Sequence, residues 1–279
     1  MLAGMIPADR LASIRSRLPR HTVLLESMAA VVAADDRWRF LELGCSLAAG
    51  GGDELSDVDA GVGYEGIPAT ELYTVARRFA EQIDTPIDLT VHRMDGWPPD
   101  WCRVAAEYPG AMQLDLVFMP AASRRGLPDR SIALVDKDDR LADEVTPPGR
   151  LPPSIDTARE WVVLGWWAVA TADKYVRRGS LFEAVQSIDE ARAHALRLWA
   201  TGRRVPYAVF GLTSLLDFPP FELPDGLAAT YALPDDAQLV AAANRATAEL
   251  LNLAAVLAGD VLDADVTSPL SLVVSDRLS

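Results

Sequence analysis

Two aspartates one residue apart, Asp57 and Asp59, are the first residues whose type and spacing could do chemistry. They begin the stretch DVDAGVGY, which is typical of a β-strand, and side chains two residues apart on a strand point to the same face. The Gly-rich segment LGCSLAAGGG precedes them, and the backbone N–H groups of such a loop can face an anion. Two carboxylates beside such a loop could hold a divalent cation and phosphate groups together.

A third carboxylate, Asp115, stands within the apolar segment MQLDLVFMP. Burying a carboxylate is costly unless it is paired or binds a metal, so Asp115 requires a partner. A metal ion shared with Asp57 and Asp59 would supply one, whereas the alternative is an edge-strand aspartate that faces solvent. We take these three as candidate catalytic and metal-binding residues. Asp88, in IDLTVH, has a similar local sequence, but no motif links it to the other carboxylates, and we interpret it as structural.

Helices and strands that alternate along the first half must position these carboxylates. The hydrophobic patterns predict a helix over about residues 8–34 and another that begins at Pro68 and continues to Ile83. The strands that we expect cover residues 39–44, 57–64, 87–92, 112–120 and 131–135.

The second half has a different pattern. The Pro- and Gly-rich segment from Ala121 to Pro153 indicates a domain boundary near residue 150. Beyond it, Thr157-x-x-Glu160 resembles a capping box for a helix that runs to about residue 178. Two more helices follow, the last of them with an apolar stripe at residues 239, 243, 246, 250, 253 and 257. We therefore expect an α+β protein, with a small mixed sheet in residues 1–150 and an α-helical bundle in residues 151–279.

The composition limits the classes of partner. The sequence has 26 Lys and Arg residues against 40 Asp and Glu residues, a net charge of −14. This balance argues against a general nucleic-acid binder and suits a metal ion or a small cationic substrate, although many proteins are simply acidic. Cys45 and Cys102 lack metal-type spacing, so we expect reduced thiols and a cytoplasmic location. The longest apolar run, Trp161–Ala172, is too short to span a bilayer, so we expect no membrane partner.

Taken in order, these motifs resemble the nucleotidyltransferase fold. In that fold a Gly-Ser or Gly-Gly pair precedes Asp-x-Asp by about ten residues, and a third acidic residue stands on a later strand. Ser46 matches the serine, SDVD at residues 56–59 matches the pair, and Asp115 fits the third position. The chain is similar in particular to aminoglycoside adenylyltransferases of the streptomycin type. That resemblance includes the segments EYPGAMQLDLVF, ALVDKDDRL and GWWAVATADKYVRRGSL.

The resemblance implies that a substrate hydroxyl attacks the α-phosphorus of ATP in line and releases pyrophosphate. It implies that Asp57 and Asp59 hold Mg²⁺, and that Asp115 completes a second metal site or takes the hydroxyl proton. The first domain would be catalytic and the helical domain would bind the acceptor, an aminoglycoside. The residues expected to contact the triphosphate are Ser46, the backbone of Gly44 and Gly50, Lys174 and Arg178.

Two positions depart from the family pattern. Cys45 occupies the place of the glycine before the serine, which puts a side chain where backbone should approach phosphate, unless Gly44 serves with the loop shifted by one residue. Some relatives use a glutamate of the helical domain as general base. Glu160 is the nearest candidate here, and it has the alternative role of a helix cap.

The sequence is also compatible with other functions. The chain could act on a macromolecule, such as tRNA or a protein, or could be a nucleotidyltransferase fold without activity. The segment FLELGC also resembles the first motif of methyltransferases that use S-adenosylmethionine, but a helix should follow it and GGGDELSD offers none. GVGYEG spells the dinucleotide-binding fingerprint by chance, because its first glycines fall inside the expected strand and Pro68 follows just after its end.

Overall fold

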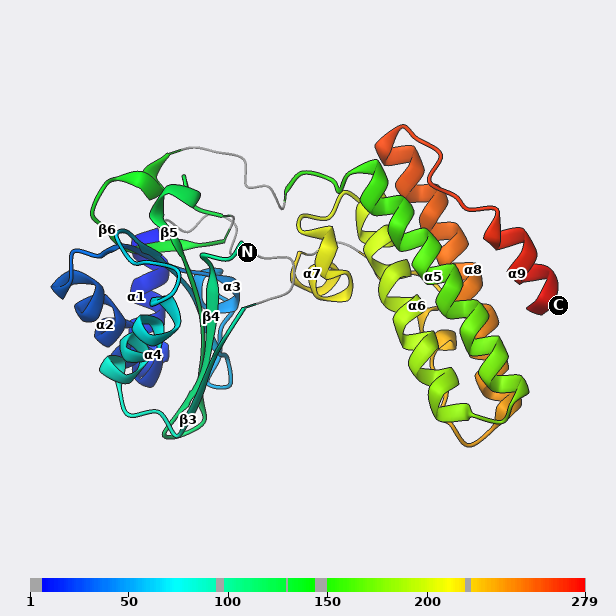
Figure 1. Cartoon of the computed structure of the whole chain (residues 1–279), viewed down its shortest axis with the longest axis horizontal. Helices are drawn as coiled ribbons and strands as arrows, with labels where there is room; N and C mark the ends of the chain where they lie inside the picture. The colour runs from blue at the N-terminus through cyan, green and yellow to red at the C-terminus, as the bar shows by residue number, and fades with distance from the viewer. Residues whose placement is uncertain (1–6, 94–97, 129, 144–149, 219–221, 279) are drawn as a thin grey trace. The chain divides into compact units, whose positions relative to one another are not determined.

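The structure, a computed structural model, describes residues 7–93, 98–128, 130–143, 150–218 and 222–278, with side chains from residue 11 onwards. The chain divides into two compact units, residues 1–147 and residues 148–279 (Figure 1). The first unit contains a β-sheet and helices, and the second contains helices, which confirms the expected α+β class.

A six-stranded mixed sheet forms the centre of the first unit, in the order β3-β4-β5-β2-β1-β6. Strands β2 and β5 run parallel, and every other neighbouring pair in this sheet is antiparallel. The strands are β1 (Trp38–Leu43), β2 (Val58–Tyr64), β3 (Asp88–His92), β4 (Cys102–Tyr108), β5 (Met112–Pro120) and β6 (Ile132–Asp136).

Helices cover one face of this sheet. The core contains every second side chain of β2 and β5, because successive side chains on a strand point to opposite faces. Trp38, Phe79 and Phe118 lie at its centre, with ring centroids 5.0–5.6 Å apart. The helices that pack on this face are α1 (Pro7–Arg17), α2 (Pro19–Ala34) and α4 (Leu72–Ile83) (Figure 1).

The expected single helix over residues 8–34 is wrong, because it is two helices. The break lies at Leu18 and Pro19, where Leu18 has φ −128° and ψ 67°. A proline ring disfavours helical backbone at the preceding residue and is itself well accommodated in the first turn of the next helix. The helix expected to begin at Pro68 begins instead at Leu72.

Strand β4, in the segment CRVAAEY, was not predicted from the sequence. Its side chains alternate between buried and half-buried, and Pro109-Gly110-Ala111 connects it to β5. Strand β1 is antiparallel to both of its neighbours. The nucleotide-binding sheets of the doubly wound class are mostly parallel, so this topology argues against the methyltransferase alternative.

The second unit is a helical bundle, as expected. Helices α5, α6 and α8 pack together around a core that includes Trp166, Trp199 and Leu251. The helices of this unit in the described part of the chain are α5 (Ile155–Arg177), α6 (Leu181–Gly202), α7 (Leu212–Asp217), α8 (Ala237–Leu262) and α9 (Leu270–Leu278).

Two details of the helical predictions are wrong. Ser154, rather than Thr157, caps α5, since its hydroxyl accepts the N–H of Thr157 at 3.1 Å. The buried face of α8 is also displaced from the predicted stripe, because Leu239 and Leu253 are exposed. The predicted residues Ala243 and Leu250 are buried as expected, and Leu251 and Ala254, which lie outside the predicted stripe, face the core as well. The small side chains of Ala243 and Ala254 let neighbouring helices approach α8 closely.

Candidate active site

Asp59 and Asp115 lie side by side on the sheet face opposite to the one that helices α1, α2 and α4 cover. The parallel pairing of β2 and β5 places Asp59 directly opposite Asp115. Their sequence neighbours Val58, Ala60, Leu114 and Leu116 are buried in the helix-covered core, so the two carboxylates project from the other face. The structure thus brings together two candidates that are 56 residues apart in the sequence.

Asp57 directly precedes β2 and is exposed. The turn before it is held by hydrogen bonds from the Leu55 N–H to Asp53 Oδ1 and from the Asp53 N–H to Ser56 Oγ. The carbonyl of Ser56 is also 2.8 Å from Nε2 of the buried His21 on α2. This turn sets where Asp57 stands relative to the strand.

Burial and neighbouring negative charge both act on the carboxylate of Asp59. Burial, followed by the charge of Asp57, raises the pKa of Asp59 to about 6, and the charge of Asp115 acts in the same direction. A hydrogen bond from the Cys45 thiol and the positive charge of Arg103 oppose this rise in pKa. Protons bind Asp59 more tightly than an ordinary carboxylate, and a metal cation would be attracted by the same charges.

Arg103 is a site residue that sequence reasoning missed. It lies on β4, where its Nε donates to Asp115 Oδ1 at 2.6 Å and its Nη2 donates to Asp115 Oδ2. The hydrogen bonds to Asp115 raise the pKa of Arg103. The signal that could have found it is the alternation of Cys102, Val104, Ala106 and Tyr108, which places Arg103 on the same face as Asp115.

The Gly-rich loop contains a single helical turn, α3 (Cys45–Ala48), where a loop was expected. Ser46 lies on this turn and is half-buried. The N–H of Gly44 donates to Asp59 O at 2.8 Å, and the N–H groups of Gly50 and Gly51 donate to the carbonyls of Leu47 and Ser46. These three amides are therefore engaged within the unit, and contacts from them to phosphates would require this turn to open.

A fourth carboxylate lies on the same face. Glu42 of β1 is 5% exposed and pairs with Gly61, two residues along β2 from Asp59. Its Oε1 accepts from Arg124 Nη2 at 2.6 Å, while its Oε2 and the Nε of Arg124 are buried without a hydrogen-bond partner among the described residues. Burial raises the pKa of Glu42, and the charge of Arg124 opposes that rise.

Lys174, Arg178 and Glu160 lie in the second unit. Lys174 is half-buried near the end of α5, with its Nζ 4.6 Å from the centroid of the Tyr175 ring. Arg178 is the exposed C-cap residue of α5, and Glu160 is exposed in its second turn. The contacts of Lys174 and Arg178 with a triphosphate, and the role of Glu160 as a base, stay predictions.

The residues fit one part of the expected metal site and not the other. Asp57 and Asp59 supply carboxylate oxygens, the ligands that Mg²⁺ prefers, and the negative charge of Asp57 acts on the half-buried Asp59. Both oxygens of Asp115 are instead engaged by Arg103. Within the described ranges, no three His, Cys, Asp or Glu side chains are grouped so that they could hold a metal ion.

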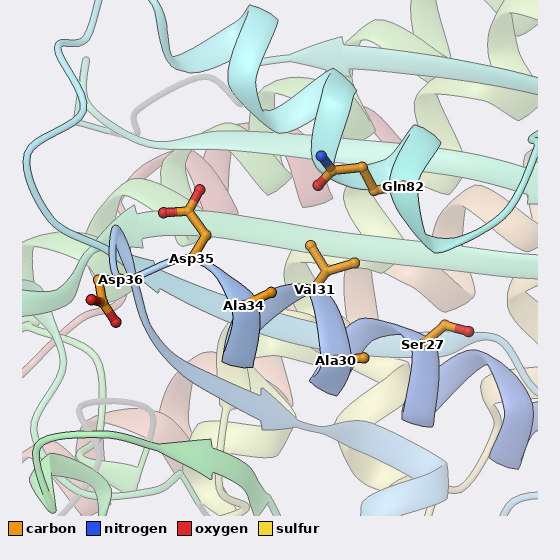
Figure 2. Close-up of a pocket in the computed structure, with 7 residues that line it drawn as sticks. All are labelled: Ser27, Ala30, Val31, Ala34, Asp35, Asp36 and Gln82. Carbon is orange, nitrogen blue, oxygen red and sulfur yellow. The ribbon is translucent and has the colours of Figure 1, made fainter.

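A pocket lies on the other side of the sheet, between helices α2 and α4. Its lining residues are Ser27, Ala30, Val31, Ala34, Asp35, Asp36 and Gln82 (Figure 2). Because α2 and α4 cover the face opposite to Asp59 and Asp115, this pocket is not part of the carboxylate site.

Similarity to known proteins is found among solved structures. No known protein family and no curated protein matches the chain. Among solved structures, the chain is similar to the crystal structure of an aminoglycoside 6-adenyltransferase from Bacillus subtilis. The two are 14% identical with a TM-score of 0.41, and the match covers 91% of this chain and 95% of that one. Of the helices described, none is long and apolar enough to cross a membrane.

Proposed function

We propose that the chain is a Mg²⁺-dependent nucleotidyltransferase that moves AMP from ATP to a hydroxyl of a small acceptor, an aminoglycoside. The observation that carries this proposal is the pairing of Asp59 with Asp115 on adjacent parallel strands, with Asp57 two residues before Asp59. Carboxylates concentrated on an uncovered sheet face, beside the loop that contains Ser46, suit a metal–triphosphate complex.

In the reaction, an acceptor hydroxyl oxygen forms a bond to the α-phosphorus of ATP. The bond from that phosphorus to the bridging oxygen breaks, pyrophosphate leaves with the electron pair, and the hydroxyl proton passes to a base. Asp57 and Asp59 would hold Mg²⁺, which when bound neutralises charge on the phosphates. Asp115, held in a fixed orientation by Arg103, would face the transferred group, and Asp115 and Glu160 are the candidates for the base.

The acceptor class follows from charge and from the motif resemblance. The net charge of −14 would favour a polycationic acceptor over a nucleic acid. Residues 148–279 would bind that acceptor, and Lys174 and Arg178 at the end of α5 would contact the triphosphate.

Pyrophosphate release from Mg-ATP across a panel of aminoglycosides tests the proposal. We expect release that depends on at least one aminoglycoside and falls by roughly 100-fold or more in Asp57→Ala, because a charge-stabilising group at the phosphates is lost. Asp88→Asn is the matched control. Asp88 is an exposed strand aspartate outside the site, so this variant should keep the wild-type rate.

Two outcomes would contradict the proposal in different ways. If ATP binds and no aminoglycoside stimulates release, the acceptor is not of this class and a macromolecular acceptor becomes the better explanation. If Asp57→Ala releases pyrophosphate as fast as Asp88→Asn, the carboxylate site does not carry the reaction.

A further inference from the structure

The contact between Arg103 and Asp115 is a two-point ion pair inside the carboxylate cluster. The planar guanidinium gives one N–H to each carboxylate oxygen, and the two side chains are 33% and 22% exposed. Such forked pairs are geometrically specific and stronger than single hydrogen bonds between neutral groups. Asp115 is therefore not an open ligand, since a cation that approached it would compete with a guanidinium that stays charged at every accessible pH.

The charges on this sheet face divide into two sets. Glu42 is paired with Arg124, and Asp115 is paired with Arg103, so each of these carboxylates has a cation of its own. Asp57 and Asp59 form no ion pair in the described part of the chain, and their like charges act on one another. The charge of Arg103 also acts on both carboxylates, but neither has an ion-pair partner of its own in the described part of the chain, so together they match the charge of one divalent cation.

We propose that the site takes a single divalent cation, through Asp57 and Asp59, and that Arg103 provides the positive charge of a second ion at Asp115. This inference rests on the proposed function, because it concerns how the same site holds a nucleotide. Arg103 is then a positioning residue. It fixes the orientation of Asp115, and its own charge lies beside the transferred group without a second ion having to bind.

The number of Mn²⁺ ions bound per chain tests whether the site takes one cation or two. The full chain is dialysed to equilibrium against Mn²⁺, with the unreactive analogue α,β-methylene-ATP in both compartments. We expect one Mn²⁺ per wild-type chain. We expect two in Arg103→Met, which frees both oxygens of Asp115, and the electron paramagnetic resonance signal should broaden because two ions then lie close together.

Two matched variants separate charge from structure. Arg103→Lys keeps the positive charge and should bind one Mn²⁺. Adding Asp115→Asn to Arg103→Met should return the count from two to one, because the freed ligand is removed. A circular dichroism spectrum like that of the wild type shows that each variant is folded.

Several results would overturn the inference. Two Mn²⁺ ions in the wild-type chain, or none, would do so whatever the variants show. A count of one in folded Arg103→Met would show that Arg103 does not stand in for an ion. The proposed function can fail independently of this inference. One bound Mn²⁺ without pyrophosphate release would refute the reaction and leave the inference intact. Two bound Mn²⁺ with pyrophosphate release would refute the role of Arg103 and leave the reaction intact.

Discussion

Cys45 stands at a left-handed backbone position beside the carboxylates, with φ +52°. A residue with a Cβ is strained there, whereas glycine adopts this conformation freely. The thiol also donates to Asp59, so the side chain has a local partner that offsets part of the strain. Cys45, which stands where the resembled motif has glycine, therefore strains the backbone at this position.

Replacing Cys45 by glycine should therefore stabilise the protein slightly. We expect Cys45→Gly to raise the free energy of unfolding by about 0.5 kcal/mol, because relief of the strain exceeds the extra flexibility that glycine gives the unfolded chain. Cys45→Ala is the matched control, since it removes the thiol and keeps the strain. Urea unfolding measures both variants, and a Cys45→Gly no more stable than Cys45→Ala would contradict the argument.

Strand β2 requires glycine at two positions, because two large side chains of the neighbouring strand β1 pack directly against its backbone. A Cβ on Gly63 would lie 2.0 Å from Cε1 of Phe40, and one on Gly61 would lie 2.6 Å from Oε1 of Glu42. Phe40 packs there with Met119, Ala121 and Leu141 over one end of the open sheet face. Gly61 and Gly63, the first two glycines of GVGYEG, are therefore needed for packing within the sheet.

A methyl group at Gly63 should disrupt this contact. We expect Gly63→Ala to lower the free energy of unfolding by about 1–3 kcal/mol, since the Phe40 ring must leave its rotamer or the strands must separate. Gly51→Ala is the comparison, because the nearest atom to its new Cβ is 4.0 Å away and its free energy of unfolding should change by less than about 0.5 kcal/mol. Equal effects in thermal or urea unfolding would argue against this packing.

At the scale of the whole molecule, the two units have separate hydrophobic cores, so a change in conditions can act on one of them. His194 lies in the helical unit, on α6, with its Nδ1 3.4 Å from Nη1 of Arg197. Burial, followed by the charge of Arg197, lowers the pKa of His194 to about 4. The folded protein therefore holds this imidazole neutral at pH values where the unfolded chain, with an ordinary pKa near 6.5, would protonate it.

The sign of the effect on stability follows from that difference. Between pH 6.5 and pH 4 the unfolded state binds a proton that the folded state does not, so stability falls as the pH falls. We expect a loss on the order of 1–2 kcal/mol from pH 7.5 to pH 5, allowing for solvent screening at this half-buried group. His194→Gln should lose less over the same range in urea unfolding. An equal loss in both proteins would assign the acid sensitivity to other groups.

The sequence alone was sufficient for features that depend on local periodicity. Alternating apolar residues marked β2 and β5 and showed that Asp57, Asp59 and Asp115 stand on or beside strands. The change to a period of 3.6 beyond residue 150 indicated helices, because an amphipathic helix repeats its apolar face within a few residues. Boundaries were less certain, as Ser154 and Leu72 show, since caps depend on hydrogen bonds that side chains only make once folded.

Only the tertiary structure decided which charged groups meet. The pairing of Asp59 with Asp115, the placement of Arg103 against Asp115 and that of Arg124 against Glu42 each join residues on different segments. Strand order and register set these contacts, and no local pattern encodes them, because pairing depends on how the whole sheet buries its apolar face. The Asp-x-Asp pair suggested the chemistry from the sequence, and the fold determined which carboxylates remain free to hold a cation.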